Sequence, residues 1–118
     1  MPRILVAEDD YYAAELCKAA LESNGHEVVV TFDGQECLRR YHDGSYDLVI
    51  LDYRLPVVSG LKVAKQMLLA NPEQQIIFLS AFATEAIADG MEELDKAIQV
   101  LRKPFEPDAL VEFVENFL

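Results

Sequence analysis

Five short runs of mostly apolar residues recur along this chain, separated by longer segments in which apolar residues repeat every three or four positions. Short continuous apolar runs are typical of strands covered on both faces, and the three-to-four spacing is typical of helices. Their alternation from one end of the chain to the other predicts a parallel sheet with helices on both faces and right-handed crossovers. The predicted strands are residues 4–7, 28–32, 48–51, 76–79 and 98–101.

Residues typical of helix ends delimit five helical segments that alternate with these strands. The expected starts are Asp33, Ser59, Thr84 and Pro107, and the expected ends are residues 23–25, Gly44 and residues 71–72. Gly90 lies inside the fourth segment and weakens it as a helix. The apolar positions expected to face the sheet are Ala13, Leu16, Cys17, Ala20 and Leu21, then Leu61, Ala64 and Leu68, then Ile87, Met91 and Leu94, and finally Leu110, Val114 and Phe117.

The length, charge and cysteine content exclude several classes of protein. A chain of 118 residues forms one core, so we expect a single domain over residues 1–118. No apolar run approaches the roughly 20 residues of a membrane span, and nothing at the N-terminus resembles a signal peptide, which favours a cytoplasmic protein. A formal charge of -11 repels a phosphate backbone, so direct nucleic-acid binding is not expected. Cys17 and Cys37 have no metal-ligand or redox spacing and are expected to be reduced.

Polar side chains follow four of the five predicted strands, at the point where each strand ends. Ligands of such sheets bind at the carboxyl ends of the strands, so these groups would share one pocket if the first, third, fourth and fifth strands are neighbours. Several carboxylates in one pocket repel each other unless a cation is bound, and a set of oxygen ligands favours Mg²⁺. The groups are Glu8, Asp9 and Asp10 after the first strand, Asp52 after the third, Ser80 after the fourth and Lys103 after the fifth.

Each of these groups, taken alone, also has a structural explanation. Residues 8–10 are compatible with a solvated loop that caps a helix, and Asp52 with a polar loop residue. Ser80 is compatible with a strand-end cap, and Lys103 with a surface charge near the edge of the sheet. Their joint occurrence at strand ends favours the shared pocket.

The same residues fall within four motifs in a fixed order. The motifs are residues 4–10 (ILVAEDD), residues 47–56 (DLVILDYRLP) with Gly60, residues 77–81 (IFLSA) and residues 103–105 (KPF). In this order and spacing they resemble the receiver domains of two-component response regulators, over essentially the whole chain. The resemblance implies a flavodoxin-like (βα)5 fold, a doubly wound five-stranded parallel sheet with strand order 2-1-3-4-5.

The resemblance also implies a role for each residue of the site. Asp52 would accept the phosphoryl group. Mg²⁺ would be held by Glu8, Asp9, Asp52 and the backbone carbonyl of Arg54. The remaining implied roles are a hydrogen bond from Ser80 to the phosphoryl group, an ion pair between Lys103 and that group, and a cis peptide before Pro104.

The partners implied are those of a signalling domain rather than an enzyme, although such a domain assists its own phosphorylation and dephosphorylation. A histidine kinase or a histidine phosphotransfer protein would phosphorylate Asp52. The phosphorylated form would alter the face made by the fourth helix, the fifth strand and the fifth helix. That face would regulate a downstream protein or an output domain, and it would carry any weak dimer of an otherwise monomeric protein.

Two departures from the family pattern concern how the signal leaves the pocket. An aromatic residue is expected three positions before Lys103, where this chain has Val100, and residues 94–97 replace a Gly-Ala pair. The usual rotation of that aromatic residue is therefore in doubt. Phe82, two residues after Ser80, is a candidate to supply the moving bulk, and ordinary packing is an equally good explanation for it.

Three alternative functions have to be compared. Haloacid-dehalogenase-type phosphatases need a second aspartate two residues after the nucleophile, where this chain has Arg54. A flavin-binding module would need a glycine- and hydroxyl-rich loop where residues 8–10 would instead repel phosphate. A receiver-like scaffold that has lost phosphorylation is the remaining alternative. His26 and His42 lie outside the strand-end set and are interpreted as surface or helix residues rather than phosphoryl donors.

Overall fold

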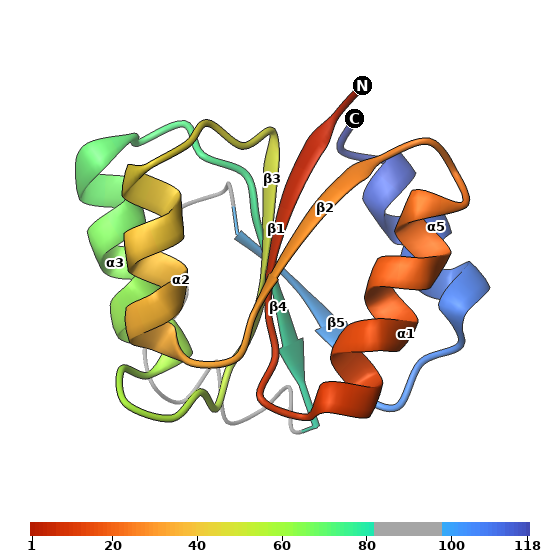
Figure 1. Cartoon of the computed structure of the whole chain (residues 1–118), viewed down its shortest axis with the longest axis horizontal. Helices are drawn as coiled ribbons and strands as arrows, with labels where there is room; N and C mark the ends of the chain where they lie inside the picture. Colours follow the sequence, from red (N-terminus) through yellow and green to blue (C-terminus); the bar gives the residue numbers. More distant parts are fainter. Residues whose placement is uncertain (82–97) are drawn as a thin grey trace.

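The computed structural model of this chain describes residues 1–81 and 98–118, which form a parallel sheet covered by helices on both faces (Figure 1). The sheet has five strands in the order β2-β1-β3-β4-β5, and each neighbouring pair is parallel. Each strand lies within one residue of its predicted bounds, so the predicted fold class and strand order are confirmed. The strands are β1 (Arg3–Ala7), β2 (Glu27–Thr31), β3 (Leu48–Asp52), β4 (Ile76–Ser80) and β5 (Ile98–Arg102).

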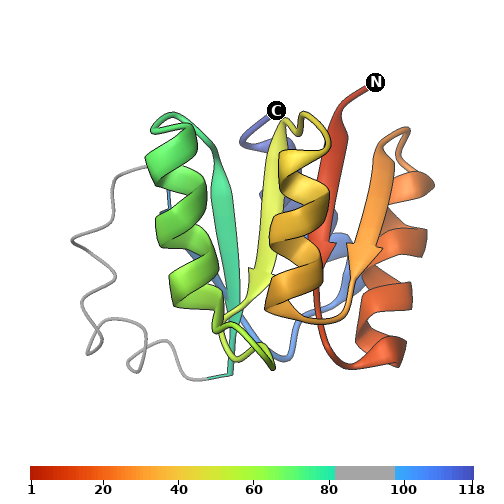
Figure 2. The same ribbon diagram turned by 60° about the vertical axis from the view of Figure 1, so that its left-hand side comes forward.

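Four helices of the described part of the chain cover the sheet, two on each face. Helices α1 (Tyr11–Glu22) and α5 (Pro107–Glu115) lie on one face, and α2 (Gly34–His42) and α3 (Gly60–Ala70) lie on the other (Figure 1). In the view of Figure 2, α2 and α3 lie in front of the sheet. The fourth predicted helix, which starts at Thr84, falls outside the described residues.

The sheet separates two apolar cores because successive side chains of a strand point to opposite faces. In β3, for example, Val49 and Leu51 face α2 and α3, whereas Leu48 and Ile50 face α1 and α5. Every residue of β3 and β4 is buried. This burial on both faces explains why the strands read as continuous apolar runs rather than as alternating ones.

The two cysteines lie in different cores, Cys17 between the sheet and α1 and Cys37 between the sheet and α2. Both thiols are free, as expected, and both are buried. The sheet between them prevents a disulfide, which requires Cα atoms within about 7 Å. Burial raises the pKa of the Cys17 thiol to about 11 and that of Cys37 to about 12, so both stay protonated at neutral pH.

Side-chain caps start three of the helices close to the carboxyl ends of strands. Asp10 Oδ1 accepts hydrogen bonds from the backbone N–H groups of Tyr12 and Ala13, at 2.9 and 3.3 Å, and caps α1. Asp33 caps α2 by accepting from a backbone N–H at 2.7 Å, and Ser59 caps α3 in the same way at 3.3 Å. The predicted starts at Asp33 and Ser59 are therefore confirmed.

The inward face of α1 differs from the predicted one. Ala14, Cys17 and Leu21 are buried, whereas the predicted Leu16 is exposed. The helix carries apolar residues almost all round, so the three-to-four spacing alone did not select the face that meets the sheet.

The inward face of α3 also shifts, to Val63, Ala64 and Met67, and the predicted Leu61 and Leu68 are only half-buried. In α5 the prediction holds for Leu110 and Val114, which are buried. Phe117 lies beyond the last residue of α5 and is half-buried.

His26 is buried, and the prediction that it is a surface residue is wrong. It lies between α1 and β2, and its Nε2 is 2.8 Å from Glu115 Oε1 at the end of α5. This contact joins segments 89 positions apart in the chain, which no local pattern reveals. His42, by contrast, is exposed at the end of α2, as predicted.

No helix of the described residues has the length and apolar composition needed to cross a membrane.

Candidate functional site

The carboxyl ends of the strands bring the predicted polar residues to one edge of the sheet. Glu8 directly follows β1, Asp52 and Ser80 are the last residues of β3 and β4, and Lys103 directly follows β5. The chain reverses its direction of winding between β1 and β3, because β2 lies on one side of β1 and all later strands lie on the other. Ligands of doubly wound sheets bind at this reversal.

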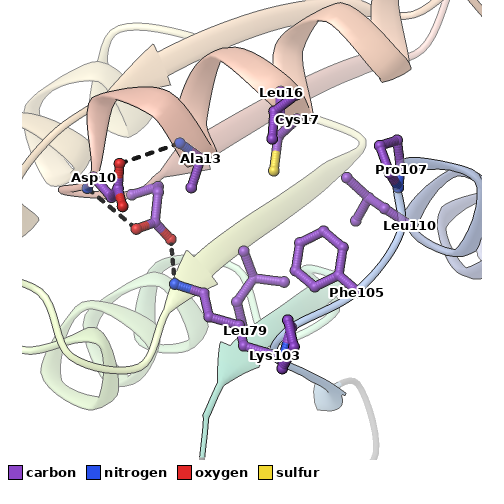
Figure 3. Close-up of a pocket in the computed structure, with 11 residues that line it drawn as sticks. Asp10, Ala13, Leu16, Cys17, Leu79, Lys103, Phe105, Pro107 and Leu110 are labelled. Carbon is purple, nitrogen blue, oxygen red and sulfur yellow. Dashed lines mark hydrogen bonds and ion pairs between the residues drawn. The ribbon is translucent and has the colours of Figure 1, made fainter.

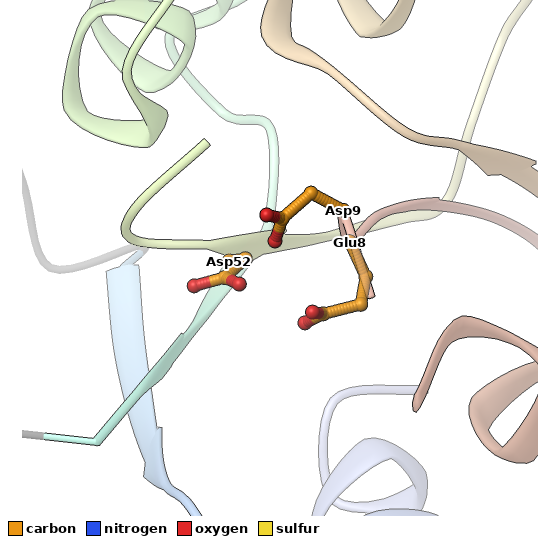
Figure 4. A group of neighbouring side chains, drawn as sticks. All are labelled: Glu8, Asp9 and Asp52. Atoms are coloured by element: carbon orange, nitrogen blue, oxygen red, sulfur yellow. The ribbon is translucent and has the colours of Figure 1, made fainter. Parts of the chain in front are cut away.

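Three carboxylates converge at this edge. Glu8, Asp9 and Asp52 each place one oxygen within 4.8 Å of the others (Figure 4). Glu8 is 1 % exposed and Asp52 is 8 % exposed, whereas Asp9 is open to solvent. Two buried carboxylates beside a third are unfavourable unless cations or hydrogen-bond donors compensate their charge.

Lys103 supplies part of this compensation. Its Nζ donates to Glu8 Oε2 at 2.7 Å and to Asp52 Oδ2 at 3.1 Å. The side chain is 26 % exposed, so the ammonium group bridges the two buried acids from the solvent side. The peptide bond between Lys103 and Pro104 is cis, as expected.

Backbone N–H groups supply the rest of the compensation that the structure describes. The N–H of Arg54 donates to Asp52 Oδ1 at 3.1 Å, and the N–H of Asp10 donates to Glu8 Oε1 at 3.2 Å. Both oxygens of Asp52 and both oxygens of Glu8 therefore have a donor. These bonds fix the directions of the two carboxylates.

The pKa values of Glu8 and Lys103 are both raised. Burial raises the pKa of Glu8 by penalising its charged form, and this effect exceeds the lowering caused by the hydrogen bond from Lys103. Burial lowers the pKa of Lys103, but the hydrogen bond to Glu8 and the negative charge of Asp52 outweigh it. Lys103 is therefore a permanent cation at neutral pH.

A cavity of about 280 Å³ opens above Asp52. This volume suits a small anion with its hydration shell rather than a large substrate. Five residues predicted or found at the site line it, together with Tyr53 and Ala81, which sequence reasoning did not identify. The described lining is Asp9, Asp52, Tyr53, Arg54, Ser80, Ala81 and Lys103.

A close backbone contact fixes the loop that follows Asp52. A Cβ atom on Gly60, the first residue of α3, would collide with the carbonyl oxygen of Asp52. The N–H of Gly60 also donates to the carbonyl of Tyr53 at 3.2 Å. The start of α3 therefore packs directly against the backbone of the site, which only glycine allows.

The structure brings Glu8, Asp9, Asp52, Arg54, Ser80 and Lys103 to one edge of the sheet, whereas the carboxylate of Asp10, which was also predicted for the pocket, caps α1. Phe82 falls outside the described residues, so its predicted movement stays a prediction. Val100 is half-buried and packs on the core beneath α2 and α3. The direct contact between Lys103 and Glu8 was not predicted, because it joins residues 95 positions apart.

Comparison with known proteins identifies the family. The family model of the response regulator receiver domain matches residues 4–115. This chain belongs to the response regulator receiver domain family. The predicted resemblance is therefore confirmed, and the domain is a receiver of the two-component response regulator type.

Relatives with curated descriptions include proteins about twice as long as this receiver and proteins of about its own length. The transcriptional regulatory protein DltR of Streptococcus agalactiae is 42 % identical over 110 residues, which cover 92 % of this chain and 48 % of DltR. The response regulator receiver protein CpdR of Brucella abortus is 30 % identical over 118 residues, 100 % of this chain and 98 % of CpdR. The receiver thus spans about half of DltR and nearly all of CpdR.

Solved receiver structures share the fold. The response regulator TrrA of Thermotoga maritima, solved in complex with Mg²⁺ and a beryllium fluoride, is 35 % identical, has a TM-score of 0.89 and is matched over 100 % of both chains. The receiver domain of the Francisella response regulator 1452 is 32 % identical, with a TM-score of 0.87 over 99 % of this chain and 96 % of that one.

Proposed function

We propose that residues 1–118 form a single receiver domain in which Asp52 accepts a phosphoryl group in the presence of Mg²⁺. The observation that carries this proposal is the convergence of Glu8, Asp9 and Asp52 on one point, with Lys103 bonded to two of them. Phosphoryl transfer depends on positioning an in-line nucleophile and neutralising charge on the transferred group, and this edge of the sheet offers groups for both tasks.

The donor set fits Mg²⁺. Hard divalent cations prefer oxygen ligands, and the three carboxylates each offer one oxygen within 4.8 Å of the others. Glu8, Asp9, Asp52 and the backbone carbonyl of Arg54 would hold the ion. When bound, Mg²⁺ would neutralise negative charge on the acceptor and on the incoming phosphoryl group. The structure of TrrA with Mg²⁺ and beryllium fluoride supports this choice by family likeness.

Arg54, Lys103 and Ser80 would orient Asp52 and bind the phosphoryl group. The N–H of Arg54 orients Asp52 by donating to Oδ1, which leaves the Oδ2 side directed toward Lys103. Lys103 would exchange its contact with Asp52 for one with a phosphoryl oxygen. Ser80 lines the same cavity and would donate its hydroxyl hydrogen to another phosphoryl oxygen.

A histidine kinase or a histidine phosphotransfer protein would supply the phosphoryl group. DltR is named a transcriptional regulatory protein and is about twice as long as the match, which supports an output domain in the same chain as one target of this receiver. A separate protein is the alternative target. The face expected from the fourth predicted helix, β5 and α5 would carry the signal and any weak dimer.

The test is incubation with Mg²⁺ and phosphoramidate, followed by intact-protein mass spectrometry. Wild type should gain the mass of one phosphoryl group, and Asp52→Asn should gain none. Asp43→Asn is the matched control, because Asp43 is an exposed aspartate at the end of α2. The same reaction in EDTA should give no product. An unmodified wild-type protein would leave the scaffold interpretation as the better one.

A further inference from the structure

A second cavity, of about 240 Å³, lies beside the phosphorylation site on the α1–α5 face of the sheet (Figure 3). It lies between α1, the end of β4, and the segment that leads from β5 into α5, and it is partly open to solvent. Its apolar walls are Ala13, Leu16, Cys17, Leu79, Phe105 and Leu110. An apolar cavity of roughly 150 Å³ holds one benzene ring, so this one has room for a ring with a short substituent.

Charged groups occupy one end of this cavity. Of the described residues that line it, Glu8 and Asp10 are acidic and Lys103 is the basic one. Lys103 Nζ donates a hydrogen bond to Glu8 Oε2. Figure 3 shows the carboxylate of Asp10 accepting a hydrogen bond from the N–H of Ala13. The cavity therefore has an apolar body and a polar end with one negative charge in excess.

We propose that this cavity binds a small amphiphile made of one apolar ring and an ammonium group on a short chain. The ring would lie between Leu16, Leu79 and Leu110. The ammonium group would lie at the polar end, where Glu8 and Asp10 offer carboxylate oxygens. A carboxylate in the same place would be repelled by Glu8 and Asp10 and attracted by Lys103 alone, whose ammonium group is already paired with Glu8. A hydroxyl group would gain hydrogen bonds without the net charge attraction.

Lys103 couples this cavity to the phosphorylation site because it lines both. An ammonium ligand at Glu8 competes with Lys103 for the same oxygen and adds a positive charge next to the carboxylates that would hold Mg²⁺. The bound amphiphile therefore slows phosphorylation of Asp52. This consequence, unlike the binding itself, rests on the proposed function.

The binding test is a titration with 2-phenylethylamine, followed by NMR of the methyl groups of Ala13, Leu79 and Leu110. Saturable shifts at these methyls are expected. 2-Phenylethanol should need about fivefold higher concentration, the difference a partly exposed ion pair makes, and phenylacetate should give no saturable shift. Equal binding of all three compounds, or shifts spread over the surface without saturation, would overturn the proposal.

Cavity-filling variants locate the site. Ala13→Leu puts a larger side chain into the cavity and should weaken 2-phenylethylamine binding at least about tenfold, while Ala109→Leu, an exposed position on α5, should leave it unchanged. If Ala13→Leu does not fold, Cys17→Met fills the same space. Unchanged binding in a folded cavity-filling variant would refute the site.

A phosphorylation assay separates this proposal from the proposed function. Saturating 2-phenylethylamine should slow modification of wild type by phosphoramidate about fivefold, and methylammonium chloride at the same concentration should not. Wild type that is never phosphorylated would refute the proposed function and leave the binding result intact. Binding with an unchanged phosphorylation rate would refute the coupling through Lys103.

Discussion

Replacing Asp9 by asparagine should stabilise this receiver in the absence of Mg²⁺ and destabilise it, relative to wild type, when Mg²⁺ is abundant. Asp9 is exposed and places an oxygen within 4.8 Å of the oxygens of Glu8 and Asp52. Neutralising it removes two repulsive pairs and changes no apolar packing. The same change removes one of the ligands proposed for the metal ion.

The distances set the size of the effect. Two like charges 4.8 Å apart repel by roughly 0.9 kcal/mol in water and by roughly 3.5 kcal/mol at an effective dielectric constant of 20. Asp9 is exposed, so the lower value applies to each of its two pairs. Lys103 lines the same cavity as Asp9, and we take its positive charge to offset about one of the two pairs. A net gain of about 1 kcal/mol without Mg²⁺ is expected, which raises the melting temperature by about 4 °C.

Mg²⁺ should reverse this order. A ligand at a hundred times its dissociation constant stabilises the folded state by roughly 2.7 kcal/mol. Wild type should gain about that amount, and Asp9→Asn should gain little. The two curves of stability against Mg²⁺ concentration should therefore cross.

Urea unfolding in EDTA and in a series of Mg²⁺ concentrations measures both effects. Glu73→Gln, which neutralises an exposed acid in the loop between α3 and β4, should change neither the stability without Mg²⁺ nor the gain on adding it. A destabilised Asp9→Asn protein in EDTA would show that repulsion at this edge is already compensated. An equal gain of both proteins in Mg²⁺ would remove Asp9 from the metal site.

Three other perturbations test separate parts of the structure. Lys103→Met should lower stability by about 2 kcal/mol at pH 7 in EDTA, because it leaves buried Glu8 without its cation. The substitution also raises the pKa of Glu8 further, so the folded state takes up a proton more readily. The loss of stability relative to wild type should therefore shrink when urea unfolding is repeated from pH 7 down to pH 5. A loss of stability that does not change with pH would contradict this. Cys17 and Cys37, with pKa values of about 11 and about 12, should react with iodoacetamide at pH 8 at least about a hundredfold more slowly in the folded than in the urea-unfolded protein, and fast labelling of the folded protein would refute their burial. Val57 has φ of +71° and is 73 % exposed, so Val57→Gly should relieve backbone strain without losing packing. The free energy of unfolding in urea should rise by about 0.5–1 kcal/mol. A lower value would show that the side chain of Val57 stabilises the loop.

The local sequence was sufficient to predict the strands and several of the helix starts. Continuous apolar runs located all five strands to within one residue, because burial on both faces requires an apolar residue at every position. Asp33 and Ser59 marked helix starts, since a short polar side chain is what satisfies the free N–H groups of a first turn. Polar residues at strand ends then indicated the site, because parallel strands end at one edge.

Contacts between distant segments were decided by the tertiary structure alone. The bond from Lys103 to Glu8 spans 95 positions, and the contact between His26 and Glu115 spans 89. Which face of α1 turns inward also depended on the sheet against which it packs, so Ala14 is buried and Leu16 is not. The sequence determined which residues prefer strands, helix starts and buried positions, because those preferences are local. Only the folded chain determined which side chains meet, since the energy of a contact depends on a partner that local sequence does not specify.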